Sequence, residues 1–383
     1  MSDTKLDALR EKLTSSAEPV TAARIAEAVR ASGWALGSAT TGELIRMLRD
    51  ELVGLGPLQP LVDEPDITDV LVDGRGQVWT DGARGLQRAE FQFESEQQVR
   101  GLARRLIALA GGRLDEGQPC ADGRIGNCRI HAVIPPVAVE GTMISVRVAR
   151  GTAGTLEQLA RQWSGADVWL PVIRGMVEAR LNVLISGATG SGKTSLLASM
   201  LAECPHRERI IIVEDTTELQ PDHPHVLHLQ QRQGNVEGAG KLGMGQLVRE
   251  TLRMRPDRLI VGECRGSELR DFLTAMNTGH RGAVGTVHAN SPDSVPARLI
   301  AMGALADLSP LAVSLQASAA LDAVIHVERR QGRRLPTAVS LVAFGDRALS
   351  MTSALVTVPG AGDQWRTETG PGWTELTGLI GLT

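Results

Sequence analysis

Lysine is almost absent from this chain of 383 residues: only Lys5, Lys12, Lys193 and Lys241 occur among its 40 basic residues. Tyrosine is missing and there are only 4 phenylalanines, so aromatic platforms on which single-stranded nucleic acid could stack are scarce. The 44 acidic residues outnumber the basic ones, which argues against a protein that coats nucleic acid through an overall positive field. Nucleic acid is therefore not expected as a direct ligand.

The cysteines are few and dispersed, with no CxxC pair among Cys120, Cys128, Cys204 and Cys264, which favours reduced thiols over a zinc site. No run approaches the roughly 18 apolar residues that a membrane-spanning helix requires. The N-terminal sequence MSDTKLDALREKL lacks the apolar core of a signal peptide. We therefore expect no zinc, no membrane span and a cytoplasmic location, with any membrane association made through a partner.

Changes in residue pattern and composition along the chain indicate four regions. Residues 1–54 repeat apolar residues at three- and four-residue spacing, which predicts a helical arm. Residues 55–152 contain short alternating strands around one amphipathic helix, which predicts a smaller α+β domain with a mostly antiparallel sheet; a linker is expected over 149–165. Residues 153–330 alternate apolar, β-branched segments with helices, as in a parallel sheet with crossover helices. Residues 331–383 are rich in Gly, Thr and Pro and are expected to be a peripheral tail.

The most specific local pattern is GATGSGKT at residues 187–194, which matches GxxxxGK[ST] between a predicted strand and a predicted helix. Its glycines let backbone N–H groups turn toward phosphate oxygens, and the helix N-terminus adds a favourable dipole. Lys193 is suited to bridge the β- and γ-phosphates, and the Thr194 hydroxyl is suited to bind Mg²⁺. We therefore expect ATP and Mg²⁺ as cofactors, with ATP held by Gly187, Ala188, Thr189, Gly190, Ser191, Gly192, Lys193, Thr194 and Ser195.

Acidic side chains end two further predicted strands. Glu263 ends the apolar strand RLIVGE, where a lone carboxylate suits a base that orients water. An ordinary Walker B strand would carry Asp at the preceding position, which here is Gly262. Glu214 and Asp215 end the strand RIIIVED, where they suit either Mg²⁺ and water or the capping of the next helix. Both interpretations of this acidic pair stay open.

Histidines occur in two settings. His288 and Asn290 follow a third apolar strand, at the same edge of the predicted sheet as the acids, which favours a functional His288 over a structural one. His223, His225 and His228 are irregularly spaced in a segment that prolines interrupt. That irregular spacing favours a surface loop over a metal site.

The last segment of the first domain, ADGRIGNCRIHAVIPPVAVEGTMISVR, carries Arg124, Arg129 and Arg147. An arginine on an antiparallel strand is normally a solvated surface residue. Phosphoryl transfer, however, needs cationic groups that neutralise charge on the γ-phosphate in the transition state, and these often come from another domain or subunit.

The order of these motifs resembles the secretion ATPase family of type II and type IV secretion systems and type IV pili, and within it the Tad (Flp) pilus-assembly branch. The resemblance covers about residues 43–328 and includes GLGPLQPLVDEPDITDVLVDG, RIHAVIPPVAVEGTMISVR, the GATGSGKT loop, IIVEDTTEL, LRMRPDRLIVGECRGSE and GHRGAVGTVHANS. It implies an α/β fold: a RecA-like P-loop NTPase domain with a parallel-containing sheet, preceded by a smaller, PAS-like α+β domain. The chain departs from the family pattern at Arg281 and Gly285, and it lacks the four-cysteine zinc module of many type II members.

The resemblance also implies roles for residues. Glu263 matches the catalytic Glu of an atypical Walker B motif, so the missing Asp is normal for the family. Glu214 would act on water or metal, and His288 would lie near the γ-phosphate. Mg²⁺ would be held by Thr194 together with Glu214 or Glu263, in part through water.

Arg129 and Arg147, and more weakly Arg124, match arginines that reach the nucleotide from the N-terminal domain. The family forms homohexamers, and an inner-membrane platform protein converts their motion into work. The resemblance therefore implies a cytoplasmic hexameric ATPase, recruited peripherally to the inner face of the cytoplasmic membrane, that drives pilus assembly or protein secretion. The alternative is a conjugation-type ATPase that transports DNA or effector proteins, because the two share every catalytic residue.

Overall fold

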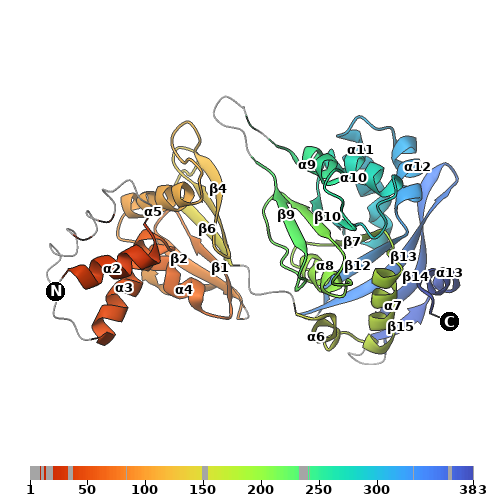
Figure 1. Cartoon of the computed structure of the whole chain (residues 1–383), viewed down its shortest axis with the longest axis horizontal. Coiled ribbons are helices and arrows are strands. Elements are labelled where there is room, and N and C mark those ends of the chain that lie inside the picture. Colours follow the sequence, from red (N-terminus) through yellow and green to blue (C-terminus); the bar gives the residue numbers. More distant parts are fainter. Residues whose placement is uncertain are drawn as a thin grey trace. The chain divides into compact units, whose positions relative to one another are not determined.

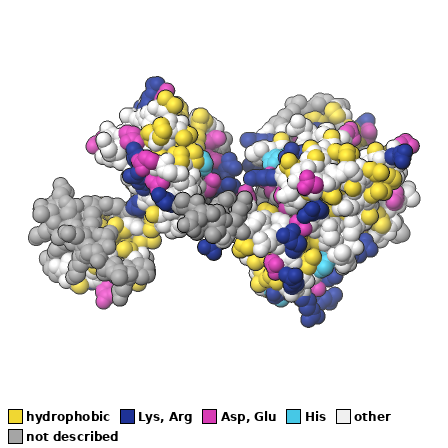
Figure 2. Space-filling model, turned by 90° about the horizontal axis from the view of Figure 1, so that it is seen from above, with side chains coloured by type: hydrophobic (Ala, Val, Ile, Leu, Met, Phe, Trp, Pro, Cys, Tyr) yellow, Lys and Arg dark blue, Asp and Glu magenta, His cyan; other side chains and the backbone are white. Residues whose placement is uncertain are grey.

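The computed structural model describes residues 9, 13, 20–32, 38–82, 84–148, 154–232, 240, 242–330, 332–360 and 365–382. These residues fall into two compact units, Met1–Arg150 and Gly151–Thr383. Each unit has its own sheet (Figure 1). On the face shown in Figure 2, basic and acidic side chains are interspersed over both units. None of the helices in the described ranges combines the length and apolarity that a bilayer crossing needs.

The first unit is built on a six-stranded antiparallel sheet with the order β3-β2-β1-β6-β5-β4. Its strands are β1 (Ile67–Val72), β2 (Gln77–Gly82), β3 (Gln87–Gln92), β4 (Cys120–Ile125), β5 (Cys128–Val133) and β6 (Met143–Val148). Its helices are α2 (Ala22–Ala31), α3 (Ser38–Leu52), η1 (Gly56–Leu58), α4 (Gln59–Asp63) and α5 (Glu96–Leu109). The sheet has the antiparallel arrangement that the alternating pattern predicts, and β4 is a strand that the sequence did not predict.

Two apolar clusters hold this unit together. Helix α5 buries Val99, Leu102 and Leu106 against the sheet, as its apolar residues at three- and four-residue spacing predict. Helices α2 and α3 pair through a separate cluster, whose members include Ile25 and Leu48. The predicted helical arm therefore has a small core of its own.

The second unit is built on a nine-stranded sheet with the order β15-β14-β13-β12-β7-β11-β10-β8-β9. The six strands from β12 to β9 are parallel, and β13, β14 and β15 add to them antiparallel. The strands are β7 (Val183–Gly187), β8 (Ile210–Glu214), β9 (Val226–Gln230), β10 (Arg258–Cys264), β11 (Val284–His288), β12 (Ala323–Arg330), β13 (Arg333–Gly345), β14 (Ala348–Pro359) and β15 (Trp365–Thr369). The predicted α/β fold with a parallel-containing sheet is confirmed.

Helices cover both faces of this sheet (Figure 1). One face packs on α6 (Leu156–Ala160), α7 (Ala166–Glu178), α8 (Lys193–Ala202) and α13 (Trp373–Ile380). The other face packs on α9 (Met244–Thr251), α10 (Glu268–Asn277), α11 (Val295–Ala304) and α12 (Pro310–Ala320), while η2 (Pro292–Ser294) precedes α11. Neighbouring residues of β8, Ile212 and Val213, belong to opposite apolar clusters. Burial on both faces explains why these strands are continuous apolar runs rather than alternating ones.

Two sequence-based expectations need correction in this unit. The segment 331–383, expected to be a peripheral tail, forms β13, β14, β15 and α13, and its first strand is buried from Leu335 to Leu341. Part of the expected linker over 149–165 instead forms α6, which begins at a capping box made by Thr155 and Gln158 and buries Leu156. Residues 149–153 lie outside the described residues.

Candidate functional site

The GATGSGKT segment connects the end of β7 to the start of α8, as its pattern predicts. Gly187 is the last residue of β7, and a Cβ atom there would lie 2.3 Å from the backbone oxygen of Val327. Gly192 has a φ of +100°, in the left-handed region that favours glycine. Close approach at one end and an unusual dihedral angle at the other explain why this turn needs glycine. Thr194, the expected Mg²⁺ ligand, is exposed in the first turn of α8.

Lys193 is the first residue of α8 and its side chain folds back over the loop. Its Nζ atom donates hydrogen bonds to the carbonyl oxygens of Gly187, at 2.9 Å, and Ala188, at 2.8 Å. The residue is only 7% exposed. Burial lowers the pKa of Lys193, although the charge of Glu263 opposes this effect. The ammonium group is thus held at the mouth of a loop whose N–H groups suit phosphate.

Glu263 lies where the pairing of β10 with β11 is irregular. The parallel register shifts between Val261 and Cys264, so β10 has one more residue than β11 over this stretch. The Thr286 hydroxyl donates a hydrogen bond to the carbonyl oxygen of Gly262, at 2.6 Å, and so fixes the irregular segment. Bulges re-aim the side chains beside them, and here the bulge contains the carboxylate expected to act as the base.

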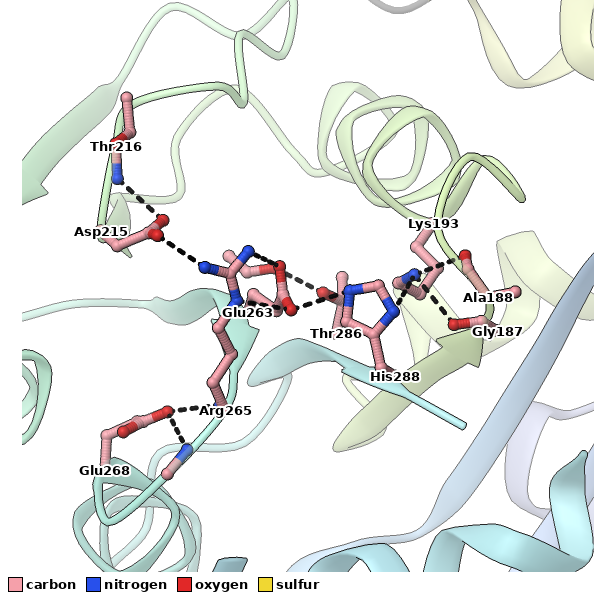
Figure 3. A network of polar contacts seen from close by, with 12 residues as sticks. Gly187, Ala188, Lys193, Asp215, Thr216, Glu263, Arg265, Glu268, Thr286 and His288 are labelled. Carbon is pink, nitrogen blue, oxygen red and sulfur yellow. Dashed lines mark hydrogen bonds and ion pairs between the residues drawn. The ribbon is translucent and has the colours of Figure 1, made fainter. Parts of the chain in front are cut away.

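His288 connects Glu263 to Lys193 (Figure 3). The Nε2 atom of His288 lies 2.9 Å from Oε1 of Glu263, and its Nδ1 atom lies 3.5 Å from the Lys193 Nζ atom. A lysine ammonium group has only donors, so its contact with Nδ1 favours the ring form whose proton is on Nε2, the nitrogen beside the carboxylate. Burial and then the Lys193 charge lower the pKa of His288, while Glu263 opposes them. The neutral tautomer therefore agrees with both the geometry and the electrostatics.

Arg265 extends this network to a second acid (Figure 3). Its guanidinium group contacts both oxygens of Glu263, each at 2.7 Å, and its Nη1 atom lies 3.0 Å from Oδ2 of Asp215. Glu268, at the start of α10, accepts hydrogen bonds from the backbone N–H groups of Arg265 and Gly266 and so holds the Arg265 backbone. Sequence reasoning did not single out Arg265 or Glu268. Their spacing of two and five residues from Glu263 was the only available signal.

The Glu263 carboxylate is partly buried, and burial alone would raise its pKa. The hydrogen bond and charge of Arg265, followed by the charges of His288 and Lys193, outweigh burial and hold the pKa of Glu263 below its ordinary value. Because the folded-state pKa is depressed, the ionised form persists at neutral pH and is lost only as pH falls through that lowered pKa.

We predict that Arg265→Ala moves the acidic limb of the pH dependence of ATP turnover to higher pH. The variant removes the largest group that lowers the pKa of Glu263 and leaves the opposing effect of burial in place. The measurement is kcat/KM for phosphate release as a function of pH. Arg253→Ala is the matched control, because Arg253 is an exposed arginine paired with Glu250 on the surface. An acidic limb that stays in place would contradict the assignment.

Glu214 is buried against the loop that follows β8, while its role toward water or metal stays a prediction. It is only 4% exposed, and its Oε1 atom accepts the backbone N–H groups of Glu218 and Leu219, each at 3.0 Å. Its Oε2 atom lies 3.8 Å from Nδ1 of His228 and has no hydrogen-bond partner among the described residues. A Cβ atom at Gly262 would lie 2.6 Å from the Glu214 Cγ atom. Glu214 thus caps the loop after β8. It also occupies the space that a side chain at residue 262 would need, the position where an ordinary Walker B strand carries Asp.

The arginines expected to reach the nucleotide form a row across the sheet of the first unit. Arg124 is directly opposite Arg129, Arg129 is opposite Arg147, and Arg147 is opposite Asp69. The Arg147 Nε atom lies 3.0 Å from the Asp69 carboxylate, and Arg129 lies 3.7 Å from Asp122. Like charges directly opposite one another destabilise a sheet, so this row suggests a use for its positive charge. The role of these arginines at the nucleotide stays a prediction.

Several other candidates are placed by their contacts. His223 and His225 lie in the loop before β9, as expected, although His223 is only 9% exposed and its Nε2 atom lies 3.1 Å from the Pro205 carbonyl oxygen; His228 instead lies on β9. Gly285 leaves room for the ring of Phe272, whose Cε1 atom would be 2.7 Å from a Cβ atom there. No group of three or more His, Cys, Asp or Glu side chains within the described ranges is arranged to hold a metal ion.

Arg334, in the region expected to be a tail, contacts the loop itself. Its Nε atom donates a hydrogen bond to the Gly190 carbonyl oxygen at 3.2 Å. Its side-chain carbons lie against Gly192, where a Cβ atom would come within 3.1 Å of the Arg334 Cδ atom. The antiparallel extension of the sheet therefore supports the GATGSGKT loop directly.

A strand–loop–helix phosphate motif with a carboxylate and a histidine at the ends of neighbouring parallel strands defines the class of P-loop nucleotide-binding proteins. Within that class, the model of the family described as type II/IV secretion system protein matches residues 51–338. The match covers most of the chain, and the chain belongs to this family of secretion ATPases.

Two relatives agree with this family, and one solved structure shares the fold. A Mycobacterium tuberculosis protein named for conjugal transfer is 47% identical over 298 residues, covering 76% of this chain and 85% of its own length. The type IV secretion system protein PtlH of Bordetella pertussis is 29% identical, with 73% and 90% covered. The DotB ATPase of Legionella pneumophila is 19% identical with a TM-score of 0.55, and the alignment covers 76% of this chain and 80% of DotB. This last likeness shows a shared fold.

Proposed function

We propose that this protein hydrolyses ATP and uses the energy to drive a secretion-type machine. The observation that carries the proposal is the continuous polar chain from Lys193 through His288, Glu263 and Arg265 to Asp215. This chain connects the phosphate-binding lysine to an ionised carboxylate at the end of a neighbouring strand. A protein that only binds nucleotide has no need of such a carboxylate.

In this proposal, Lys193, Glu263 and His288 each have a separate role. Lys193 exchanges its two loop carbonyl partners for phosphate oxygens, which a flexible ammonium group can do readily. Glu263 accepts a hydrogen bond from the attacking water and orients it, while its lowered pKa makes it a weak base that stays ionised. His288 keeps its Nε2 atom 2.9 Å from the Glu263 carboxylate and so helps to position it. Mg²⁺, held by Thr194 and water, would neutralise charge on the phosphates.

Phosphate release by the purified full chain tests this proposal. We expect MgATP-dependent turnover that Lys193→Ala abolishes, because no other described lysine lies at the loop. Arg253→Ala again serves as the surface control. A wild-type protein that binds ATP but releases no phosphate, alone or with added nucleic acid or lipid, would contradict the hydrolytic function.

We also propose that the chain acts as a homohexamer in which Arg129 and Arg147 of the first unit neutralise charge on the nucleotide. Support comes from the row of arginines on one sheet face and from the need of phosphoryl transfer for such cations. Closed rings give every subunit the same interface, which suits arginines that act across a boundary. Mass measurement in solution with a nonhydrolysable ATP analogue tests the ring, and a persistent monomer would contradict it.

We predict that Arg147→Ala lowers ATP turnover at least about tenfold, since cations of this kind contribute ~10³-fold or more in related phosphoryl transfer. Its thermal midpoint should hardly change, because its ion pair with Asp69 is exposed and such pairs contribute about 0–1 kcal/mol. Asp69→Ala is the matched control, since it breaks the same ion pair from the other side. If both variants lose turnover equally, Arg147 has only a structural role.

For the cargo, we propose pilus assembly of the Tad type, with an inner-membrane platform protein as partner and the ATPase at the cytoplasmic face. The motif order from GLGPLQPLVDEPDITDVLVDG to GHRGAVGTVHANS supports this proposal. A conjugation-type motor is the second candidate, because similar proteins are named for conjugal transfer and type IV secretion. Deleting the gene should abolish surface pili in electron micrographs and leave DNA transfer in mating assays unchanged. The reverse result would favour the second candidate.

A further inference from the structure

One cation beside the candidate site takes no part in the network just described. Arg298 is the fourth residue of α11, the helix that follows the His288 segment. Together with Ala188, Thr189, His288 and Asn290 it lines a pocket of about 580 Å³. The pocket thus has the first residues of the phosphate-binding loop on one side and Arg298 on another.

Arg298 lacks the partners that a partly buried arginine usually has. Its Nε atom is buried without a hydrogen-bond partner among the described residues, and within the same ranges no carboxylate forms an ion pair with it. Buried guanidinium groups are normally paired, because an unsatisfied charge loses its hydration without compensation. Its position in the first turn of α11 also places it at the positive end of the helix dipole, where an acidic residue would be favoured.

The positive charge of Arg298 affects His288 in the candidate nucleotide site. Its charge contributes, after burial, Lys193 and Arg265, to lowering the pKa of His288. The side of the pocket formed by Ala188 and Thr189 is the beginning of the loop, and His288 connects this side to Glu263. An anion in this pocket would therefore lie between Arg298 and the first residues of the loop, beside His288, which contacts both Lys193 and Glu263.

From this arrangement we infer that Arg298 binds the terminal phosphate of ATP from within the same unit and makes the site prefer ATP over ADP. The inference rests on the proposed function and names one further residue for it. The phosphate oxygens supply the acceptors that the guanidinium group lacks. ADP lacks this γ-phosphate, so it would leave Arg298 unpaired.

Equilibrium binding of a nonhydrolysable ATP analogue and of ADP tests this assignment. Arg298→Ala should weaken binding of the ATP analogue about tenfold to a hundredfold, the range expected for a hydrogen bond to a charged group, and change ADP affinity less than about twofold. Arg298→Lys, which keeps the charge without the planar fork, should recover part of the lost affinity. Arg253→Ala should change neither affinity.

Two results would overturn the inference. If Arg298→Ala weakens the binding of both nucleotides equally and lowers the thermal midpoint, Arg298 only supports the fold. If the affinity for the ATP analogue is unchanged, Arg298 does not face the phosphate. Binding of both nucleotides is measured without turnover, so the result stands apart from the hydrolysis assay. A wild-type protein that shows this ATP preference but releases no phosphate would contradict the proposed hydrolysis and leave the assignment of Arg298 intact.

Discussion

The Glu263→Gln protein is expected to bind ATP with near wild-type affinity and to turn it over at least ~100-fold more slowly, the contribution that a positioned acid or base usually makes. The substituted amide would retain the volume of the side chain while losing the negative charge that accepts from water. The charge also holds Arg265 and His288 in place, at 2.7 Å and 2.9 Å. The measurements are kcat for phosphate release and the Kd of a fluorescent ATP analogue.

Glu250→Gln is the matched control, because Glu250 is an exposed glutamate that pairs with Arg253 on the surface. We expect its turnover to match wild type. Thermal unfolding of both variants separates lost chemistry from lost folding, since Glu263 also belongs to an ion-pair network. Near-normal turnover by Glu263→Gln would rule out the assignment of this carboxylate.

Gly262→Ala is expected to lower the free energy of unfolding by about 1–3 kcal/mol, the usual cost of an extra methyl group in a packed interior. The new Cβ atom would lie 2.6 Å from the Cγ atom of the buried Glu214. Displacing Glu214 would release the loop that carries Asp215, so turnover should fall as well. Gly262→Asp, which creates an ordinary Walker B sequence, should cost more because it places a second carboxylate beside a buried one.

Chemical denaturation of each variant measures the change. Gly378→Ala is the control, because its Cβ atom would meet nothing within 4 Å in α13, and helical Gly→Ala changes stabilise by about 0.4–1 kcal/mol. The double variant Gly262→Ala/Glu214→Ala provides a cycle: if the clash is the cause, the two effects should be non-additive by about 0.5–3 kcal/mol. Additive effects would show that Gly262 matters for another reason.

Much of the second unit was predictable because its signals are local. The GATGSGKT pattern needs only eight adjacent residues, and apolar runs such as RIIIVED and RLIVGE reveal strands buried on both faces. The rule that ligands gather at the carboxyl ends of parallel strands then predicts that Glu263 and His288 share one edge. The 2.9 Å contact between these two side chains agrees with that prediction.

The rest depended on contacts between distant segments. The sequence presents Glu214 and Asp215 as equivalent acids, yet one turns into the loop as a cap and the other faces Arg265. Only the packing of β8 beside β10 decides between them, and the absence of a side chain at Gly262 is part of that packing. The same holds for Arg298, whose lack of a partner among the described residues cannot be seen in a sequence.

The expectation of a peripheral tail failed because composition was given more weight than pattern. Gly, Thr and Pro are frequent after residue 330, yet LPTAVSLVAF is an apolar run ended by a two-residue turn. Asp346 and Arg347 both have positive φ there, at 50° and 61°, as the type I′ hairpin turn requires. The turn was a detectable signal, because strands joined by such a turn pair along their length.

The hydrogen bond from Arg334 to Gly190 has a practical consequence for isolating the second unit. A fragment that stops at residue 330 would contain every residue of the GATGSGKT loop and all six parallel strands. It would nevertheless expose the edge of β12 and remove the side chain that rests on Gly190 and Gly192. Such a fragment should aggregate through its open strand edge, whereas one that extends to residue 382 keeps the edge covered.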